Sequence, residues 1–123
     1  TVFPYMMVSD ANAFLGFLSK VFGATEIGRS VFPDGRIANI RITIGTSNFM
    51  VSEATDDMQV TPAAYYIYVE DVDATFDKAI ACGATEIFAA ADMPYQDRQA
   101  GVKDPFGMSW WISNRLVTKP YDS

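Results

Sequence analysis

The chain has 123 residues, half of them hydrophobic, which suits one globular domain with a substantial core. Its 15 acidic residues outnumber 9 basic ones and give a pI near 4.4, which argues against a nucleic-acid binder, because such proteins neutralise phosphates with Lys and Arg. The absence of histidine removes the usual general base and the commonest metal ligand.

Hydropathy and cysteine usage bear on where the protein works. No apolar run approaches the roughly 18–20 residues of a membrane span, so no membrane partner is expected. Cys82 is the only cysteine, which rules out an intrachain disulfide and fits a reducing cytoplasm. The acidic balance is typical of ordinary solubility, although it would also favour a cationic ligand through long-range attraction.

A five-residue segment occurs twice, first at Gly23–Ile27 and again at Gly83–Ile87. Asp10 precedes the first copy and Asp71 precedes the second, each before an apolar stretch with helical spacing. An aspartate at such a place accepts a hydrogen bond from a helix N-terminus, and a glycine suits the position just past the helix end. The repeat therefore predicts one helix in each half, beginning after the aspartate and ending at the glycine.

The remaining segments alternate as strands do, and two turn sequences separate them. Pro33–Gly35 and Asp104–Gly107 have the Pro and Gly that tight turns use. The predicted strands are Val2–Val8, Thr25–Phe32, Arg36–Ile44 and Asn48–Ser52 in the first half, and Ala63–Val69, Thr85–Phe88, Arg98–Lys103 and Met108–Ser113 in the second. We therefore expect a single α+β domain over residues 1–123, made of two βαβββ modules (1–53 and 62–115) with a linker at 54–61.

Strand alternation sorts the side chains into two faces. The apolar face expected under the helices holds Val2, Pro4, Met6, Val8, Ala38, Ile40, Ile42, Ile44, Phe49, Val51, Tyr65, Ile67, Val69, Trp110 and Ile112. The opposite face mixes aromatic and polar residues: Phe3, Tyr5, Met7, Asn39, Arg41, Asn48, Met50, Ser52, Ala64, Tyr66, Tyr68, Ser109, Trp111 and Ser113. That mixture is typical of a ligand pocket, and a second core layer or a dimer interface is the equal alternative.

Several segments stand out together: Pro4-Tyr5 before the first helix, the turn Pro33–Arg36, Val69–Asp73, and Asp104–Gly107 followed by Trp110-Trp111. They resemble the vicinal oxygen chelate superfamily, the fold of glyoxalase I, bleomycin-resistance proteins, fosfomycin-modifying enzymes and extradiol dioxygenases. The PhnB-like branch is the most similar, over roughly residues 2–115. The resemblance implies that the two modules wrap a U-shaped cleft, but fold alone does not fix the reaction.

The metal enzymes of that superfamily carry ligands on the first and last strands of each module. The repeat places these positions at Phe3, Met50, Ala64 and Trp111, whose side chains cannot form an oxygen and nitrogen site for a divalent ion. Asn39 and Met108 stand where relatives often have histidine. The resemblance and these departures predict a fold without the family's metal chemistry and with no cofactor.

The candidate ligand-binding residues lie on the aromatic face and its expected partner strand. They are Tyr5, Asn39, Arg41, Met50, Tyr66, Tyr68, Arg98 and Trp111, and no catalytic residue is assigned. Arg41 could bind a carboxylate or stack on an aromatic ring, and an ion pair with Glu53 or another acid is the equal alternative. Cys82 has no histidine to activate it and is expected to fill space in the helix rather than act as a nucleophile.

Two functions remain open from the sequence. The first is a metal-free binding protein that sequesters an antibiotic or another planar small molecule, as bleomycin-resistance relatives do. The second is a lyase or isomerase of the glyoxalase type, or a metal-dependent transferase, which only the fold analogy supports. A homodimer is expected because relatives complete their clefts by pairing units or chains.

Overall fold

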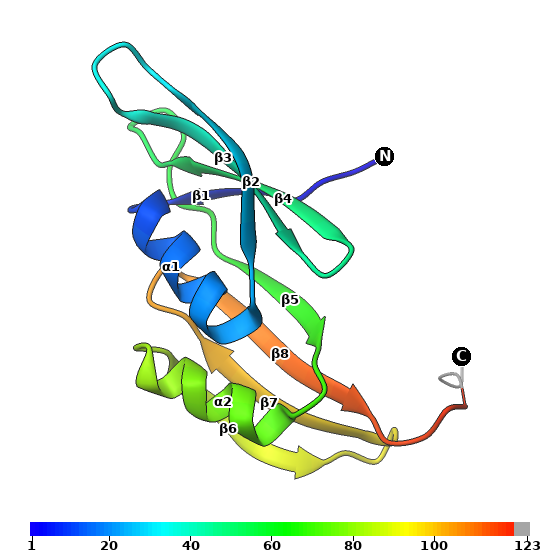
Figure 1. Cartoon of the computed structure of the whole chain (residues 1–123). Helices are drawn as coiled ribbons and strands as arrows, with labels where there is room; N and C mark the ends of the chain where they lie inside the picture. The colour runs from blue at the N-terminus through cyan, green and yellow to red at the C-terminus, as the bar shows by residue number, and fades with distance from the viewer. Residues whose placement is uncertain (120–123) are drawn as a thin grey trace. The chain divides into compact units, whose positions relative to one another are not determined.

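The computed structural model describes residues 1–119, which group into two compact units that divide between Pro62 and Ala63. Both units have the order βαβββ (Figure 1). The first contains β1 (Tyr5–Val8), α1 (Ala11–Phe22), β2 (Thr25–Val31), β3 (Ile37–Ile44) and β4 (Ser47–Glu53). The second contains β5 (Ala63–Tyr68), α2 (Val72–Ala81), β6 (Thr85–Asp92), β7 (Asp97–Lys103) and β8 (Met108–Arg115).

The two sheets have the same topology. The strand order is β1-β4-β3-β2 in the first unit and β5-β8-β7-β6 in the second. The first strand of each unit pairs in parallel with the last, and all other pairs are antiparallel. The α+β class and the duplicated βαβββ module predicted from the sequence are confirmed.

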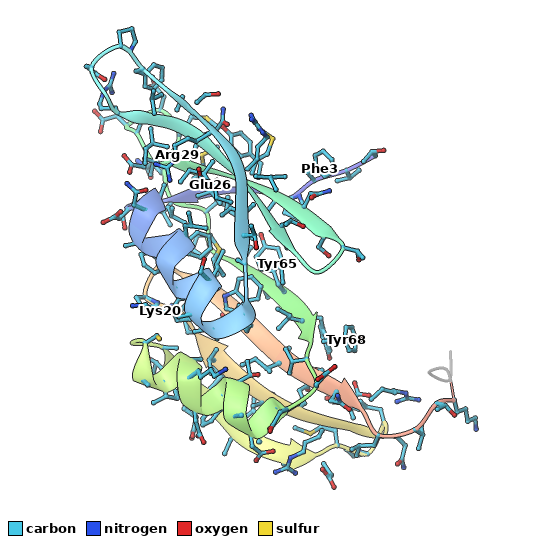
Figure 2. The ribbon with its side chains drawn as sticks, in the orientation of Figure 1. Phe3, Lys20, Glu26, Arg29, Tyr65 and Tyr68 are labelled. Atoms are coloured by element: carbon cyan, nitrogen blue, oxygen red, sulfur yellow. The ribbon has the colours of Figure 1, made fainter. Side chains whose placement is uncertain are left out.

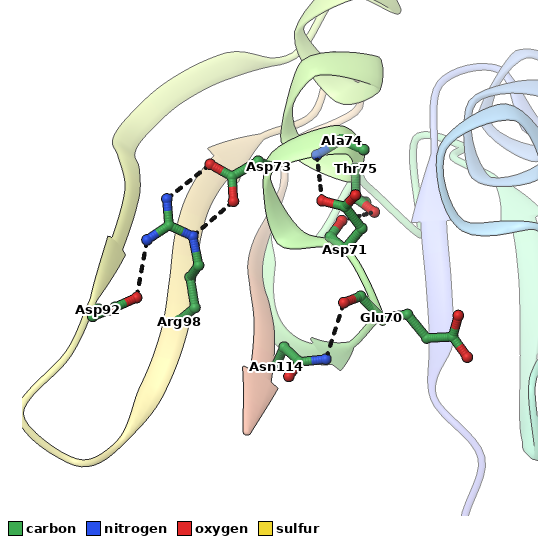
Figure 3. Close-up of polar contacts among 8 residues, drawn as sticks. All are labelled: Glu70, Asp71, Asp73, Ala74, Thr75, Asp92, Arg98 and Asn114. Atoms are coloured by element: carbon green, nitrogen blue, oxygen red, sulfur yellow. Dashed lines mark hydrogen bonds and ion pairs between the residues drawn. The ribbon is translucent and has the colours of Figure 1, made fainter. Parts of the chain in front are cut away.

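Both helices begin as the repeat predicts, and α1 also ends as predicted. The carboxylate of Asp10 accepts a hydrogen bond from the backbone N–H of Ala13 at 3.0 Å, and Asp71 accepts one from Ala74 at the same distance (Figure 3). Gly23 follows α1 with a φ of 71°, a left-handed conformation that glycine adopts without a steric penalty. α2 ends at Ala81 and its C-terminal cap is Cys82 with a φ of −91°, so the left-handed Gly83 (φ 102°) follows one residue later than Gly23 does.

One face of each sheet is covered by the helix of the same unit. In the first unit α1 contacts β3 and β4, where Ile40, Ile42 and Val51 are fully buried. In the second unit α2 contacts β6, β7 and β8, and the buried residues there include Val102 and Ile112. Four of these residues, Ile40, Ile42, Val51 and Ile112, are on the face that the sequence assigned to the core.

The Asp104–Gly107 turn is held by one buried carboxylate. Asp104 accepts hydrogen bonds from the backbone N–H groups of Phe106 (2.8 Å) and Met108 (3.0 Å), and from the indole Nε1–H of Trp110 (2.8 Å). Burial raises the pKa of Asp104, and these hydrogen bonds oppose the rise. The ring of Trp110 also packs against Tyr65 with centroids 5.1 Å apart, so the turn, β5 and β8 are tied together.

Two strand ends differ from the expectation by more than two residues. β1 begins at Tyr5 rather than Val2, and β6 continues to Asp92 rather than ending at Phe88. The pairing of β6 with β7 shifts register between Phe88 and Ala91, so the side-chain alternation that marks a strand is broken there. No helix within residues 1–119 is long and apolar enough to cross a membrane.

The neighbouring tryptophans of β8 provide a test of this register. Trp110 is 1% exposed, whereas Trp111 is partly exposed on the other face. Trp110→Ala should lower the free energy of unfolding by about 3–5 kcal/mol, because the surroundings of a buried ring relax only partly. Trp111→Ala should lower it clearly less, as measured by urea denaturation.

Trp110→Phe is the matched control, since it keeps a ring but removes the donor to Asp104. We expect it to fall between the wild type and Trp110→Ala. A larger loss for Trp111→Ala than for Trp110→Ala would mean that β8 faces the other way.

Candidate functional site

The face of each sheet opposite the helix carries the aromatic and polar side chains. In the first unit, strand pairing places Tyr5, Met50, Arg41 and Gly28 in one row across all four strands. Tyr5 is 54% exposed, and Arg41 is also exposed. Three of the predicted site residues of this unit therefore lie side by side.

The second unit has the corresponding row. Tyr66 pairs with Trp111, Trp111 with Gly101, and Gly101 with Phe88. Tyr66 is 56% exposed, and the ring of Phe88 meets that of Trp111 edge-on with centroids 6.3 Å apart. Tyr66 and Trp111 are thus neighbours on one face, as predicted.

Each row depends on a glycine that lies beneath a large side chain. A Cβ on Gly28 would come within 2.4 Å of Nη2 of Arg41, so the guanidinium of β3 extends across the edge strand β2. In the second unit the arrangement is reversed: a Cβ on Gly101 would lie 2.5 Å from Cε1 of Phe88, so the ring of the edge strand extends over β7. The same row therefore presents a cation in one unit and an aromatic ring in the other.

A pocket of about 310 Å³ lies on this face of the second unit. Its lining residues are Tyr66, Tyr68, Tyr95 and Asp97. The rings of Tyr66 and Tyr68 have centroids 6.3 Å apart, and Tyr68 is 58% exposed (Figure 2). Exposed aromatic rings around a concave surface can bind the apolar part of a small molecule.

Polar groups at this pocket are connected to one another. The Tyr95 hydroxyl donates to Oε1 of Gln99 at 2.5 Å, and Nε2 of Gln99 donates to Oγ of Ser113 at 2.7 Å. Asp97 is fully buried and forms an ion pair with Arg115 at 3.2 Å. Desolvation raises the pKa of Tyr95, and the neighbouring Tyr66 and Asp97 raise it further, so Tyr95 stays a neutral donor and acceptor at neutral pH.

A second pocket, of about 340 Å³, lies within the first unit. It is lined by Tyr5, Met7, Phe32, Arg36, Ile37, Ala38, Ser52, Glu53, Ala54, Thr55 and Met58. The hydroxyl of Tyr5 is 2.8 Å from Oγ of Ser52, which donates to the carbonyl of Ala38 at 2.8 Å. Tyr5 is therefore held at the pocket wall by a hydrogen bond as well as by its strand.

Asn39 is on the same strand as Arg41, and its side-chain oxygen has no hydrogen-bond donor among the described residues. It is two residues before Arg41 on β3 and pairs with Ser30 of β2. Its side-chain Oδ1 is buried and accepts no hydrogen bond from the described residues. A buried acceptor without a donor is unusual in a folded protein and marks a place where a ligand or water could supply one.

The placement of Arg98 corrects the sequence-based expectation. Arg98 was expected to join Arg41 on the aromatic face, but its guanidinium binds Asp73 at the start of α2 (2.7 and 2.8 Å) and Asp92 of β6 (2.9 Å) (Figure 3). These acids raise the pKa of Arg98, and Arg98 lowers that of Asp73. Arg98 is therefore occupied on the helix side of its sheet.

The residues that sequence reasoning missed follow from the same parity. On β7 the buried Ala100 and Val102 lie on the helix side, so Gln99 and Asp97 must face the other way. In the sequence, the apolar Ala100 and Val102 two positions apart were the signal that Gln99 and Asp97 face away from the helix. Tyr95 lies outside any strand, in the turn between β6 and β7, and no sequence pattern marked it.

The four positions that correspond to metal ligands do not fit a divalent ion. Phe3 lies before β1 and is 49% exposed, Ala64 lies on β5, and Met50 and Trp111 occupy the two cross-strand rows. Hydrocarbon, thioether and indole side chains are poor ligands for divalent metals that prefer oxygen and nitrogen. Within residues 1–119, no group of three or more Cys, Asp and Glu side chains is placed to hold such an ion.

Comparisons with known proteins agree with this architecture. The family model described as Glyoxalase/Bleomycin resistance protein/Dioxygenase superfamily matches residues 3–112. The Mycobacterium bovis protein Mb0911c is 33% identical over 118 residues, which cover 87% of this chain and 78% of that protein. The Mycobacterium tuberculosis protein Rv0887c is also 33% identical, with 87% of this chain and 69% of that protein covered.

Solved structures of similar fold include three with informative names. A glyoxalase/bleomycin resistance protein/dioxygenase family enzyme from Burkholderia phytofirmans PsJN is 25% identical with a TM-score of 0.77, covering 93% of this chain and 97% of that one. TioX from Micromonospora sp. ML1 is 24% identical (TM-score 0.74, 94% and 100% covered). The PhnB protein from Bacillus cereus is 18% identical (TM-score 0.76, 93% and 98% covered).

The two glycines of the rows should respond differently to substitution. Gly28→Ala displaces only the flexible end of Arg41, and we expect a change in unfolding free energy within about 0.5 kcal/mol, as at most surface sites. Gly101→Ala forces a half-buried ring to move, and overpacking of this kind costs about 1–3 kcal/mol. Urea denaturation measures both losses, and tryptophan emission reports the change around Trp111. Equal losses for the two variants would contradict the close packing of Phe88 over Gly101.

Proposed function

Because the chain belongs to the Glyoxalase/Bleomycin resistance protein/Dioxygenase superfamily, we propose that it is a metal-free protein that binds and sequesters a planar or amphipathic small molecule, such as an antibiotic. The ligand lies on the helix-free faces, where aromatic side chains supply contact area and a few polar groups supply orientation. The observation that carries this proposal is the row of Tyr66 and Trp111 beside a 310 Å³ pocket lined by tyrosines.

The proposed binding residues are the sequence candidates without Arg98, together with two further residues of the second unit. Tyr5, Asn39, Arg41 and Met50 form the proposed surface of the first unit, and Tyr66, Tyr68 and Trp111 that of the second. Tyr95 and Gln99 add hydrogen-bonding groups to the second surface. Arg98 is left out because two carboxylates already bind it.

The alternative is a lyase or isomerase of the glyoxalase type, or a metal-dependent transferase. The name of the Burkholderia relative, which calls that protein an enzyme, favours this alternative. The residues at Phe3, Met50, Ala64 and Trp111 oppose it, because none of them supplies an oxygen or imidazole ligand.

The oligomeric state and location belong to the same proposal. We expect a homodimer, with an exposed apolar strip on the edge strand β2 (Ile27 and Val31) available for contact. A stable mass near 13.6 kDa in light scattering would count against it. A reducing cytoplasm suits the half-buried free thiol of Cys82.

A thermal-shift screen tests the proposed function. Planar aromatic antibiotics and other flat amphipathic molecules should raise the melting temperature, because a ligand that binds only the folded state stabilises it, by about 2.7 kcal/mol at a hundredfold excess over Kd. Zn²⁺, Mn²⁺, Ni²⁺ and Fe²⁺ should not. Tyr66→Ala should remove the shift, and Ile87→Ala, at another exposed apolar side chain of the second unit, should keep it.

Two results would contradict the proposal. One is stoichiometric metal that survives desalting of the protein, which would favour the enzymatic alternative. The other is a ligand-induced shift that Tyr66→Ala leaves unchanged, since binding would then lie away from the tyrosines.

A further inference from the structure

Arg41 differs from every other arginine of the chain in its surroundings. The four others each bind a carboxylate: Arg29 binds Glu26 at 2.5 Å (Figure 2), Arg36 binds Asp34 at 2.7 Å, Arg98 binds Asp73 at 2.7 Å and Arg115 binds Asp97 at 3.2 Å. No hydrogen bond or ion pair to the guanidinium of Arg41 is found among residues 1–119. Within that part of the chain, Arg41 is therefore an arginine whose charge has no internal partner.

Glu53, the acid that the sequence offered as a partner for Arg41, is used elsewhere. Its Oε1 accepts a hydrogen bond from the backbone N–H of Ala11 at 3.4 Å, at the first turn of α1. A carboxylate is stabilised at a helix N-terminus by the orphan N–H groups and the helix dipole. The ion pair between Arg41 and Glu53, which the sequence left open as an alternative to ligand binding, is therefore not formed.

The position of the guanidinium is set by the sheet. Arg41 pairs with Gly28 on one side and Met50 on the other, and its Nη2 lies where a Cβ on residue 28 would stand. A side chain at position 28 would push the guanidinium away, so the glycine lets it lie against the backbone of β2. Next to it on the same face is the buried, unpartnered Oδ1 of Asn39.

We propose that Arg41 is an anion-binding residue of the first unit, which binds the carboxylate or phosphate group of an amphipathic ligand while Met50 and Tyr5 contact the apolar part. A guanidinium offers a planar pair of N–H donors that matches two oxygens of such a group. Tyr5, Met50 and Arg41 are adjacent in one row, so an apolar surface leads directly to the cation. The inference rests on the proposed function and narrows its ligand class.

The net charge of the chain does not prevent this contact. The formal charge of −6 would repel an anion at long range, but exposed charges are screened beyond about 10 Å at 0.1 M salt. The contact at Arg41 is short-range, and the four other arginines each offset a carboxylate. Binding of an anion should therefore persist at moderate ionic strength, where salt screens the repulsion by the rest of the chain.

Three probes with one ring system test the inference: 2-naphthoate, 2-naphthyl phosphate and the neutral 2-naphthamide. Their affinities for the full chain are measured by NMR titration, including the Nε–Hε signal of Arg41. We expect at least one anion to bind about tenfold or more tightly than the amide, as a hydrogen bond to a charged group implies. The difference between naphthoate and naphthyl phosphate then tells whether the group is a carboxylate or a phosphate.

Variants assign the effect to the residue. Arg41→Gln should remove the preference for anions, so that naphthoate and the amide bind with similar affinity, and Arg41→Lys should keep part of the preference. Lys20→Gln removes the same charge from the exposed end of α1 (Figure 2) and should behave as the wild type. Dispersed backbone spectra establish that each variant is folded.

The outcomes separate this inference from the proposed function. Equal binding of the anions and the amide, or an anion preference that survives in Arg41→Gln, would overturn the role of Arg41 and leave a ligand-binding aromatic face standing. Failure of all three probes to bind the wild type would count against both.

Discussion

Each four-stranded sheet of this chain receives one helix from its own unit, so that helix can bury only one of the two faces. The alternation of buried apolar side chains with other side chains along the strands follows from this constraint. Ile40, Ile42, Val102 and Ile112 point to the helix and are fully buried, while their neighbours along the strand must face the other way. What those neighbours are decides what the protein can bind, because the helix of their own unit does not cover them.

The duplicated module uses the uncovered face in two different ways. In both units the row across the strands begins with a tyrosine on the first strand and continues to Met50 or Trp111 on the last. The next two positions of the row hold one large and one small residue, in opposite order. In the first unit Arg41 of β3 lies over Gly28 of β2, and in the second Phe88 of β6 lies over Gly101 of β7. One backbone arrangement thus offers a guanidinium in one half and an aromatic ring in the other.

Much of this fold could be predicted from the sequence because its determinants are local. Asp10 and Asp71 cap helices through their own side chains, Asp104 closes a turn four residues long, and adjacent tryptophans must face opposite ways. Arg98 was expected to join Arg41, but it shares the strand parity of the buried Ala100 and Val102, which places it on the helix side of β7. The parity of those two residues outweighs a single arginine.

Other features of the site could not be predicted because they depend on which groups meet in space. The sequence left Arg41 equally suited to a ligand or to an ion pair with Glu53 or another acid, and it could not show that Glu53 contacts the start of α1 instead. The relay from Tyr95 through Gln99 to Ser113 joins a turn to two strands. The register shift in β6 breaks the alternation of side chains, so the pattern does not show how far the strand continues.

The central claim is that ligand binds the helix-free face and leaves the helix-covered face untouched. The chain has two tryptophans, one on each face of β8, so their two indole N–H signals in an NMR spectrum report on the two faces separately. Trp111→Phe assigns the signals by removing one. On titration with a planar ligand from the thermal-shift screen, we expect the Trp111 signal to shift in proportion to occupancy and the Trp110 signal, held by Asp104, to stay in place. A shift of Trp110 alone, or of neither signal at saturation, would contradict the account.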